Sequence, residues 1–163
     1  MDAITMRSTH WILKQVKKDF PHIHFKPAHG FWWSAASATI YTDLEAEHNQ
    51  EFTLHELSHA LLGHNRYERD VELLKLERDA WEYAKNNLAT KYKVFISENI
   101  IQDNLDTYRH WLHARSTCPE CETIGVQTRE RHYQCISCNH KWRVNEARLC
   151  SLRRYSMSTD QIK

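Results

Sequence analysis

Glycine and proline are scarce in this chain of 163 residues, with three of each, and the first cysteine comes only at residue 118. So few flexible or chain-breaking residues argue against long disordered linkers. The sequence also lacks an apolar run long enough to cross a bilayer. Its first residues, Met-Asp-Ala-Ile-Thr, have neither the basic nor the apolar segment of a secretory signal. We therefore expect a cytoplasmic protein with no membrane partner.

Charge is divided unevenly along the chain. Residues 1–109 contain 13 Lys and Arg against 16 Asp and Glu, whereas residues 110–163 contain 9 against 5. Four thiolates and one zinc ion bound in the second segment would add two negative charges to it. The C-terminal third is thus weakly basic, and nucleic acid is one of the partners that this charge allows.

The hydrophobic pattern predicts an α+β fold in two modules. Helices are expected at residues 3–20, 50–62 and 68–89 and from Ser97 onward, and the first should have Ile4, Trp11, Val16 and Phe20 on its apolar side. Aromatic and β-branched segments predict two or three short strands at residues 22–25, 31–33 and 38–42. The character of the chain changes after Arg115, so we place one module at 1–113 and a second at 114–163.

The segment His55-Glu56-Leu57-Ser58-His59 combines two ligand types with an acid at helical spacing. Histidines at i and i+4 lie one turn apart on one helix face, so both imidazoles can bind a single zinc ion. Glu56 is offset by about 100° and can act as general base on a water at that metal. A surface helix with two solvated histidines is the alternative, but the surrounding segment 52–62 is apolar on several sides. A buried helix with these polar groups needs a partner such as a metal.

His64 and Glu77 are the candidates for a third ligand. On a continued helix His64 would point about 140° away from the metal face, although a turn at Gly63 could redirect it. The metzincin pattern requires Gly and His at the positions of Leu62 and Asn65, so this chain does not match it. We expect His64 at the helix end, touching a ligand or the substrate.

Glu77 is the one carboxylate in an otherwise apolar helical face, formed by Leu73, Glu77, Ala80, Ala84 and Leu88. Its burial requires a partner, and a metal on the neighbouring helix would be one. A salt bridge to an unidentified base is the alternative. Asp79 is a weaker candidate, because its own face is polar, with Glu72, Lys75, Glu82 and Asn86.

Residues 55–64, followed by 77–84, resemble the ImmA/IrrE family of metallopeptidases. That family has an HExxH helix and then a helix of the form E-x-E-A-(N/D)-x-F-A, and the resemblance covers about residues 20–90. It implies a small gluzincin-like, zincin-type fold with Glu77 as the third zinc ligand. It also implies a protein substrate, in many members a helix-turn-helix repressor. The chain departs from the family pattern at Asp79, Trp81 and Tyr83, and Trp81 replaces a small polar side chain that could orient a ligand.

Substrate contacts can be expected around the same helix. In small gluzincins an edge strand beside the metal pairs with extended substrate, and we assign residues 38–42 to that role. Trp32 and Trp33 either line the cleft or belong to the core. His64 and Tyr83 are candidates for stabilising the transition state.

Four of the five cysteines form two C-x-x-C pairs, Cys118 with Cys121 and Cys135 with Cys138. Two such knuckles predict a closed site with four sulfur ligands for a structural zinc ion, typical of a zinc ribbon. Two disulfides are the alternative, which a reducing compartment disfavours. Cys150 is expected to be a small buried apolar residue.

Two functions are consistent with these motifs. The first is a zinc endopeptidase with one catalytic and one structural zinc ion. The second is a nucleic-acid-binding or regulatory ribbon protein whose protease-like module is inactive. Its basis is the set of C-terminal cations, namely Arg129, Arg131, Lys141, Arg143, Arg148, Arg153 and Arg154.

Overall fold

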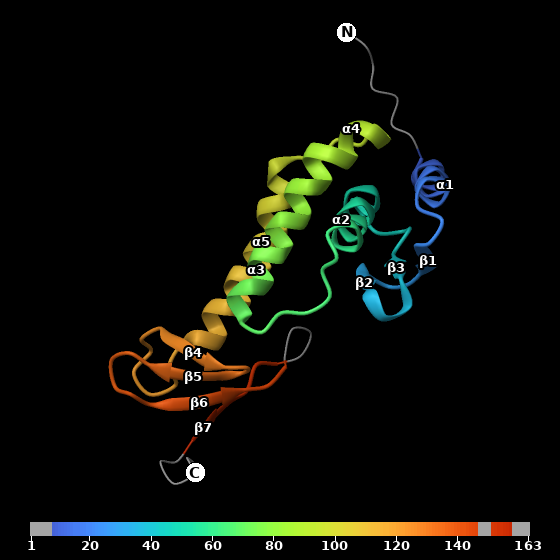
Figure 1. The fold of residues 1–163 in the computed structure, drawn as a ribbon. Helices are drawn as coiled ribbons and strands as arrows, with labels where there is room; N and C mark the ends of the chain where they lie inside the picture. Colours follow the sequence, from blue (N-terminus) through green and yellow to red (C-terminus); the bar gives the residue numbers. More distant parts are fainter. Residues whose placement is uncertain (1–7, 147–150, 158–163) are drawn as a thin grey trace. The chain divides into compact units, whose positions relative to one another are not determined.

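The computed structural model describes residues 8–146 and 151–157, drawn as a ribbon in Figure 1. The chain divides into two compact units. The first contains the residues up to Arg66 together with Leu76–Gln102, and the second contains Tyr67–Lys75 together with the residues from Asp103 onward. The boundary that we place between residues 113 and 114 separates two functional modules, and it stays a prediction.

A three-stranded mixed sheet lies in the first unit (Figure 1). Its strands are β1 (His24–Pro27), β2 (Trp32–Ser34) and β3 (Thr39–Thr42). β3 is central, pairing in parallel with β1 and antiparallel with β2. β2 and β3 lie within one residue of the predicted segments 31–33 and 38–42, whereas β1 begins two residues later than the predicted segment 22–25. The assignment of residues 38–42 as the edge strand is wrong, because β3 has a partner on both sides and β1 and β2 are the edges.

The first helix, α1 (Thr9–Asp19), begins at Ser8, whose hydroxyl accepts a hydrogen bond from the backbone N–H of Trp11. Its buried residues are Ile12, Leu13 and Val16, all with exposed fractions of 8% or less. The expected apolar side was therefore only partly right, since Val16 is buried but Trp11 and Phe20 are half-buried. Ile4 lies outside the described residues.

α2 (Asn49–Leu61) is the buried helix that the sequence predicts. Every residue from Thr53 to His59 is buried, although five of these seven side chains are polar or charged. Two of the polar groups are satisfied within the helix, because Thr53 and Ser58 donate to the carbonyl oxygens of Asn49 and Leu54. The remaining buried polar residues are His55, Glu56 and His59.

The next helical segment is interrupted near its C-terminal end. α3 (Asp70–Tyr83) continues into a π-helical turn at Ala84–Leu88 and then α4 (Ala89–Tyr92), where a single helix over residues 68–89 was predicted. The predicted apolar face is confirmed, since Leu73, Glu77, Ala80, Ala84 and Leu88 are all buried. α5 (Glu98–Ser116) follows, with the Ser97 hydroxyl accepting from the backbone N–H of Ile100 as its predicted N-cap.

A four-stranded antiparallel sheet lies in the second unit (Figure 1). The strands β4 (Gly125–Arg129), β5 (His132–Cys135), β6 (Lys141–Val144) and β7 (Arg154–Ser156) pair in chain order. One face forms a small core with Cys118, Tyr133, Cys135, Trp142 and Val144. A Cβ atom at Gly125 would lie 2.4 Å from Cη2 of Trp142, so glycine is required for this indole to pack.

Asp70, at the start of α3, is the centre of a buried polar network in the second unit. Its Oδ2 accepts from Nε of Arg115 at 2.6 Å and from the hydroxyl of Tyr133. Arg115 also donates to the carbonyl of Asn145, and its own carbonyl accepts from Nε1 of Trp142. These bonds fix the sheet to the helix ends that precede it, a role that no local motif in the sequence indicated.

The predicted α+β class is thus confirmed at the level of its parts: a short mixed sheet, helices carrying the two histidines and Glu77, and a C-terminal antiparallel sheet with four cysteines. Among the described residues no helix has both the length and the apolar character needed to span a membrane. Cys150 lies outside the described residues.

Candidate metal centres

Helix α2 places His55 and His59 one turn apart, with their ring centroids separated by 4.6 Å. Both Nε2 atoms point to the same spot, 3.2 Å from one another. The side chains are almost fully buried, at 3% and 10% exposed. Two imidazoles in such surroundings form a pair of neighbouring nitrogen donors that bulk water scarcely reaches.

Glu77 of α3 completes the group. Its Oε2 lies 3.0 Å from Nε2 of His55 and 3.5 Å from Nε2 of His59, and its side chain is 6% exposed. The three side chains form one of the two groups of potential metal ligands found among the described residues. The prediction that Glu77 converges on the two histidines is therefore confirmed, and Asp79, which is half-buried and paired with Arg78, is not part of the group.

The donor set fits a tetrahedral divalent ion. Zinc bonds of about 2.0–2.1 Å place neighbouring tetrahedral donors roughly 3.3 Å apart. The observed separations of 3.0, 3.2 and 3.5 Å bracket that value. Two imidazoles and one carboxylate leave a fourth position, which is the donor composition of catalytic rather than structural zinc sites.

The surroundings of Glu77 favour the ionised form of its carboxyl group, which is the form that binds a metal ion. Burial by itself raises the pKa of the Glu77 carboxyl, but hydrogen bonds and charge interactions with His55 and His59 outweigh it, so the pKa falls well below its usual range. The carboxylate is therefore negatively charged at neutral pH. An anionic ligand between two imidazoles offsets part of the charge of a divalent cation in a buried site.

Glu56 is on the same helix but is not one of the three converging donors. Its side chain is buried, and this burial raises its pKa, while the two imidazoles and a hydrogen bond from the backbone N–H of Trp33 act in the opposite direction. A carboxyl group with a raised pKa beside a metal site is suited to accept and return a proton near neutral pH. The contact with Trp33 also places strand β2 next to Glu56, which sequence reasoning missed.

His64 is brought back to the site by the end of α2. Gly63 adopts a left-handed conformation with φ of 70°, its N–H bonds to the carbonyl of Ala60, and the N–H of His64 bonds to the carbonyl of His59. This pair of bonds is a Schellman motif, which reverses the chain. Nδ1 of His64 then lies 2.9 Å from Nδ1 of His59. His64 thus contacts the candidate ligand His59 at Nδ1, the ring nitrogen that does not face Glu77, which is one of the two roles predicted for it.

Nδ1 of His55, the ring nitrogen that does not face Glu77, has different surroundings from Nδ1 of His59. Among the described residues it finds no hydrogen-bond partner, although the atom is buried. The imidazole instead stacks on Trp81, with centroids 4.2 Å apart and ring planes 22° apart. Trp81 therefore supports His55 by packing, at the position where the resembling family has a small polar residue.

The remaining predicted site residues, Tyr83, Trp32 and Trp33, are not part of the group formed by His55, His59 and Glu77. In the described part of the chain, the Tyr83 side chain makes no hydrogen bond to His55, His59 or Glu77, so its accessory role stays a prediction. Trp32 is 45% exposed and stacks on Tyr41, so it is not a core residue. Trp33 is half-buried, and its Nε1 donates to the carbonyl of His64 at 3.1 Å.

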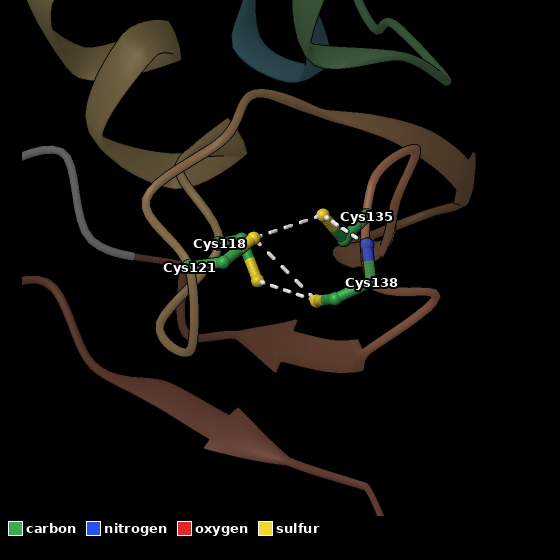
Figure 2. Close-up of side chains that lie close together, drawn as sticks. All are labelled: Cys118, Cys121, Cys135 and Cys138. Carbon is green, nitrogen blue, oxygen red and sulfur yellow. Dashed lines mark hydrogen bonds between the residues drawn. The ribbon is translucent and has the colours of Figure 1, made fainter.

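The second group of potential ligands consists of Cys118, Cys121, Cys135 and Cys138, whose sulfur atoms face one another in Figure 2. Sulfur separations are 3.5 Å from Cys121 to both Cys135 and Cys138, and 3.8 Å from Cys118 to Cys138. All four thiols are free, so the disulfide alternative does not hold in this structure.

These distances fit a closed tetrahedral site, because zinc–sulfur bonds of about 2.3 Å separate neighbouring sulfurs by roughly 3.8 Å. The backbone N–H groups of Ser137 and Cys138 donate to the sulfur of Cys135, as in a metal-binding knuckle. Hydrogen bonds from the side chain and backbone of Thr123 lower the pKa of the Cys121 thiol to about 6. At Cys138 a backbone hydrogen bond from His140 lowers the pKa, but desolvation and the contacts with the other three sulfurs outweigh it, so the pKa of that thiol is raised. The thiolate form that binds metal is therefore favoured at Cys121 in particular.

Comparisons of the chain with protein-family models, with curated proteins and with solved structures found no match. The functional argument accordingly depends on the geometry of the two centres.

Proposed function

We propose that this protein is a zinc-dependent endopeptidase of zincin-like, gluzincin type. His55, His59 and Glu77 hold the catalytic zinc ion, and Glu56 is the general base. The observation that carries the proposal is the convergence of Nε2 of His55, Nε2 of His59 and Oε2 of Glu77 within 3.0–3.5 Å in a buried pocket of side chains. The resemblance to the ImmA/IrrE family supports the same three ligands.

A bound zinc ion would polarise the carbonyl of the scissile peptide bond and acidify a water molecule beside it. Glu56 takes one proton from the attacking water as its oxygen adds to the carbonyl carbon. The carboxyl group then returns this proton to the leaving nitrogen as the C–N bond breaks, so one water is consumed for each bond hydrolysed. Burial raises the pKa of the Glu56 carboxyl, which favours the first of these transfers, from water to the carboxylate.

Substrate binding is assigned to the edge strand β2, in place of residues 38–42. β2 is paired on one side by β3, and the backbone N–H of Trp33 reaches Glu56. An extended peptide that pairs with this edge would run beside the general base. Such pairing uses main-chain bonds, which suits a protein substrate such as a helix-turn-helix repressor, the substrate type that the resemblance implies.

The four-cysteine module is proposed to be a zinc ribbon with a structural ion. Its core contains few large apolar side chains, chiefly Tyr133, Trp142 and Val144. A core of this size contributes little folding free energy, so metal binding to the four thiolates would supply much of it. The intact protein is thus expected to bind two zinc ions per chain in a cytoplasmic setting.

The decisive experiment compares Glu56→Gln with Glu51→Gln, a matched control five residues earlier on the same helix. Zinc content by elemental analysis should stay at two per chain in both variants. Cleavage of labelled casein, and of a helix-turn-helix repressor encoded beside the gene, should be lost in Glu56→Gln only. The amide retains the shape of the side chain but cannot accept the proton.

Unchanged cleavage by Glu56→Gln would refute the general-base assignment. Failure of the zinc-loaded wild type to cleave either protein would refute the endopeptidase. If the wild type binds only one zinc ion, and Glu77→Ala still binds that ion, then the assignment of His55, His59 and Glu77 as zinc ligands is refuted.

A further inference from the structure

The sheet of the second unit has two chemically different faces. Along β5 and β6 the buried residues Tyr133, Cys135, Trp142 and Val144 alternate with more accessible ones. Because side chains alternate across a strand, the accessible residues share the opposite face. We call it the outer face, formed by Val126, Arg129, His132, Gln134, Lys141, Arg143 and Tyr155.

The strand register places four of these residues in one row. Arg129 of β4 pairs with His132 of β5, His132 pairs with Arg143 of β6, and Arg143 pairs with Tyr155 of β7. A bulge at Gln127–Arg129 brings Arg129 opposite His132. With strands about 4.8 Å apart, the row extends roughly 14 Å across the sheet. It combines cations with an aromatic ring at its end.

No acidic residue occurs in the four strands, whose sequences are GVQTR, HYQC, KWRV and RYS. The nearby acids Glu130 and Glu146 pair with Arg131, which lies in the turn before β5. Within residues 8–146 and 151–157, neither Arg129, Lys141 nor Arg143 has an ion pair. Among the described residues the outer face therefore has three positive charges without an acidic partner.

Tyr155 distinguishes this face from a simple basic patch. Its side chain is 42% exposed, and the guanidinium of Arg143 lies 5.0 Å from its ring centroid. An exposed aromatic ring beside free cations is the combination that binds single-stranded nucleic acid, because the ring stacks on an unpaired base while the cations contact phosphates. An anionic membrane or an acidic protein would use the charges but offers no base for the ring.

We propose that the outer face of the four-cysteine module binds single-stranded nucleic acid, with Arg129, Lys141 and Arg143 contacting phosphates and Tyr155 stacking on a base. The weakly basic charge of residues 110–163 is consistent with this interface but did not locate it. The interface is independent of the proposed peptidase chemistry, since its residues belong to a different unit from His55, His59 and Glu77.

The test measures fluorescence anisotropy of a labelled 20-nucleotide oligothymidine titrated with the full-length, zinc-loaded protein. Three phosphate contacts predict that binding weakens about twentyfold between 50 and 200 mM salt, given a slope near −0.7 per contact for single strands. Arg129→Glu combined with Arg143→Glu should abolish binding. The matched control, Arg78→Glu with Arg109→Glu, makes the same change in net charge at exposed helix positions and should leave binding unchanged.

Stacking is tested separately at Tyr155. Tyr155→Ala should weaken binding about tenfold, whereas Tyr155→Phe should retain it. Zinc content of every variant should remain at the wild-type value, which shows that the module is still folded. The Glu56→Gln variant should bind the oligonucleotide as the wild type does, and the arginine variants should still cleave casein, so failures of the two proposals are distinguishable.

Several results would overturn the inference. Equal loss of binding in the control pair would show a nonspecific charge effect, and the absence of binding at 50 mM salt would exclude the interface. Tighter binding to a duplex of equal length, with no effect of Tyr155→Ala, would refute single-strand recognition. Tighter binding to phosphatidylserine vesicles than to the oligonucleotide would identify a lipid surface instead.

Discussion

Replacing His64 tests whether the turn at the end of α2 serves the metal site. If Nε2 of His59 binds the metal, its Nδ1 carries the proton and donates to Nδ1 of His64, 2.9 Å away. His64→Leu removes this acceptor and leaves the N–H of the buried His59 imidazole without it. His64→Asn retains an acceptor oxygen close to the position of Nδ1. The two variants therefore separate the hydrogen bond from the bulk of the side chain.

The expected magnitude follows from one hydrogen bond to a ligand that carries partial positive charge when metal is bound. Such bonds contribute about 1.5–3 kcal/mol, against about 1 kcal/mol for neutral pairs. Since about 1.4 kcal/mol corresponds to a factor of ten, His64→Leu should weaken metal binding at this site about 10- to 100-fold, in line with other groups that orient ligands. His64→Asn should stay within about threefold of the wild type.

The assay is a zinc titration against graded chelator buffers, which resolves two binding steps for the two centres. Only the step assigned to His55, His59 and Glu77 should shift, so the four-cysteine step is an internal control in each sample. His22→Leu, at an exposed position, controls for loss of a histidine as such. Equal affinities of the Leu and Asn variants, or a shift of both steps together, would refute the orienting role of His64.

Three further predictions concern single positions. Glu77→Ala should reduce the zinc content from two ions per chain to one, measured by elemental analysis, and two retained ions would contradict the ligand assignment. Gly125→Ala should destabilise the second unit by about 1–3 kcal/mol in calorimetry, because the new Cβ meets the indole of Trp142 at 2.4 Å. Trp81→Asn should lower the free energy of unfolding in urea by about 3–5 kcal/mol while giving Nδ1 of His55 a partner. An unchanged urea midpoint would contradict that estimate.

The two centres could be predicted from sequence because their geometry is local or periodic. Histidines four residues apart on a helix share a face, and C-x-x-C pairs form knuckles wherever they occur. Glu77 could be predicted for the same reason, because a single carboxylate in an otherwise apolar helical face is easily recognised. That α2 packs against α3 could not be read from the sequence. The buried histidines and the buried Glu77 each needed a polar partner, however, and one metal ion could serve both helices.

Sheet order was not predictable in the same way. Which of three short strands takes the centre depends on pairings between segments far apart in the chain, and β-propensity carries no such information. The wrong sheet order placed the expected substrate edge at residues 38–42 instead of β2. For the same reason the contact between Trp33 and Glu56 was missed. The π-helical turn at Ala84–Leu88 was missed because nothing in Ala-Lys-Asn-Asn-Leu marks it.

At Trp81 packing supports a candidate metal ligand where a polar contact could have done so. A polar residue there could satisfy Nδ1 of His55, and an unsatisfied buried N–H costs about 1–3 kcal/mol. The indole is fully buried and contacts both the His55 ring and Phe52. Its removal would cost about 3–5 kcal/mol, which exceeds the gain from one hydrogen bond. The site is therefore held asymmetrically, with His59 oriented by a hydrogen bond to His64 and His55 oriented by stacking, and its metal affinity should depend on the packing of this core as much as on polar contacts.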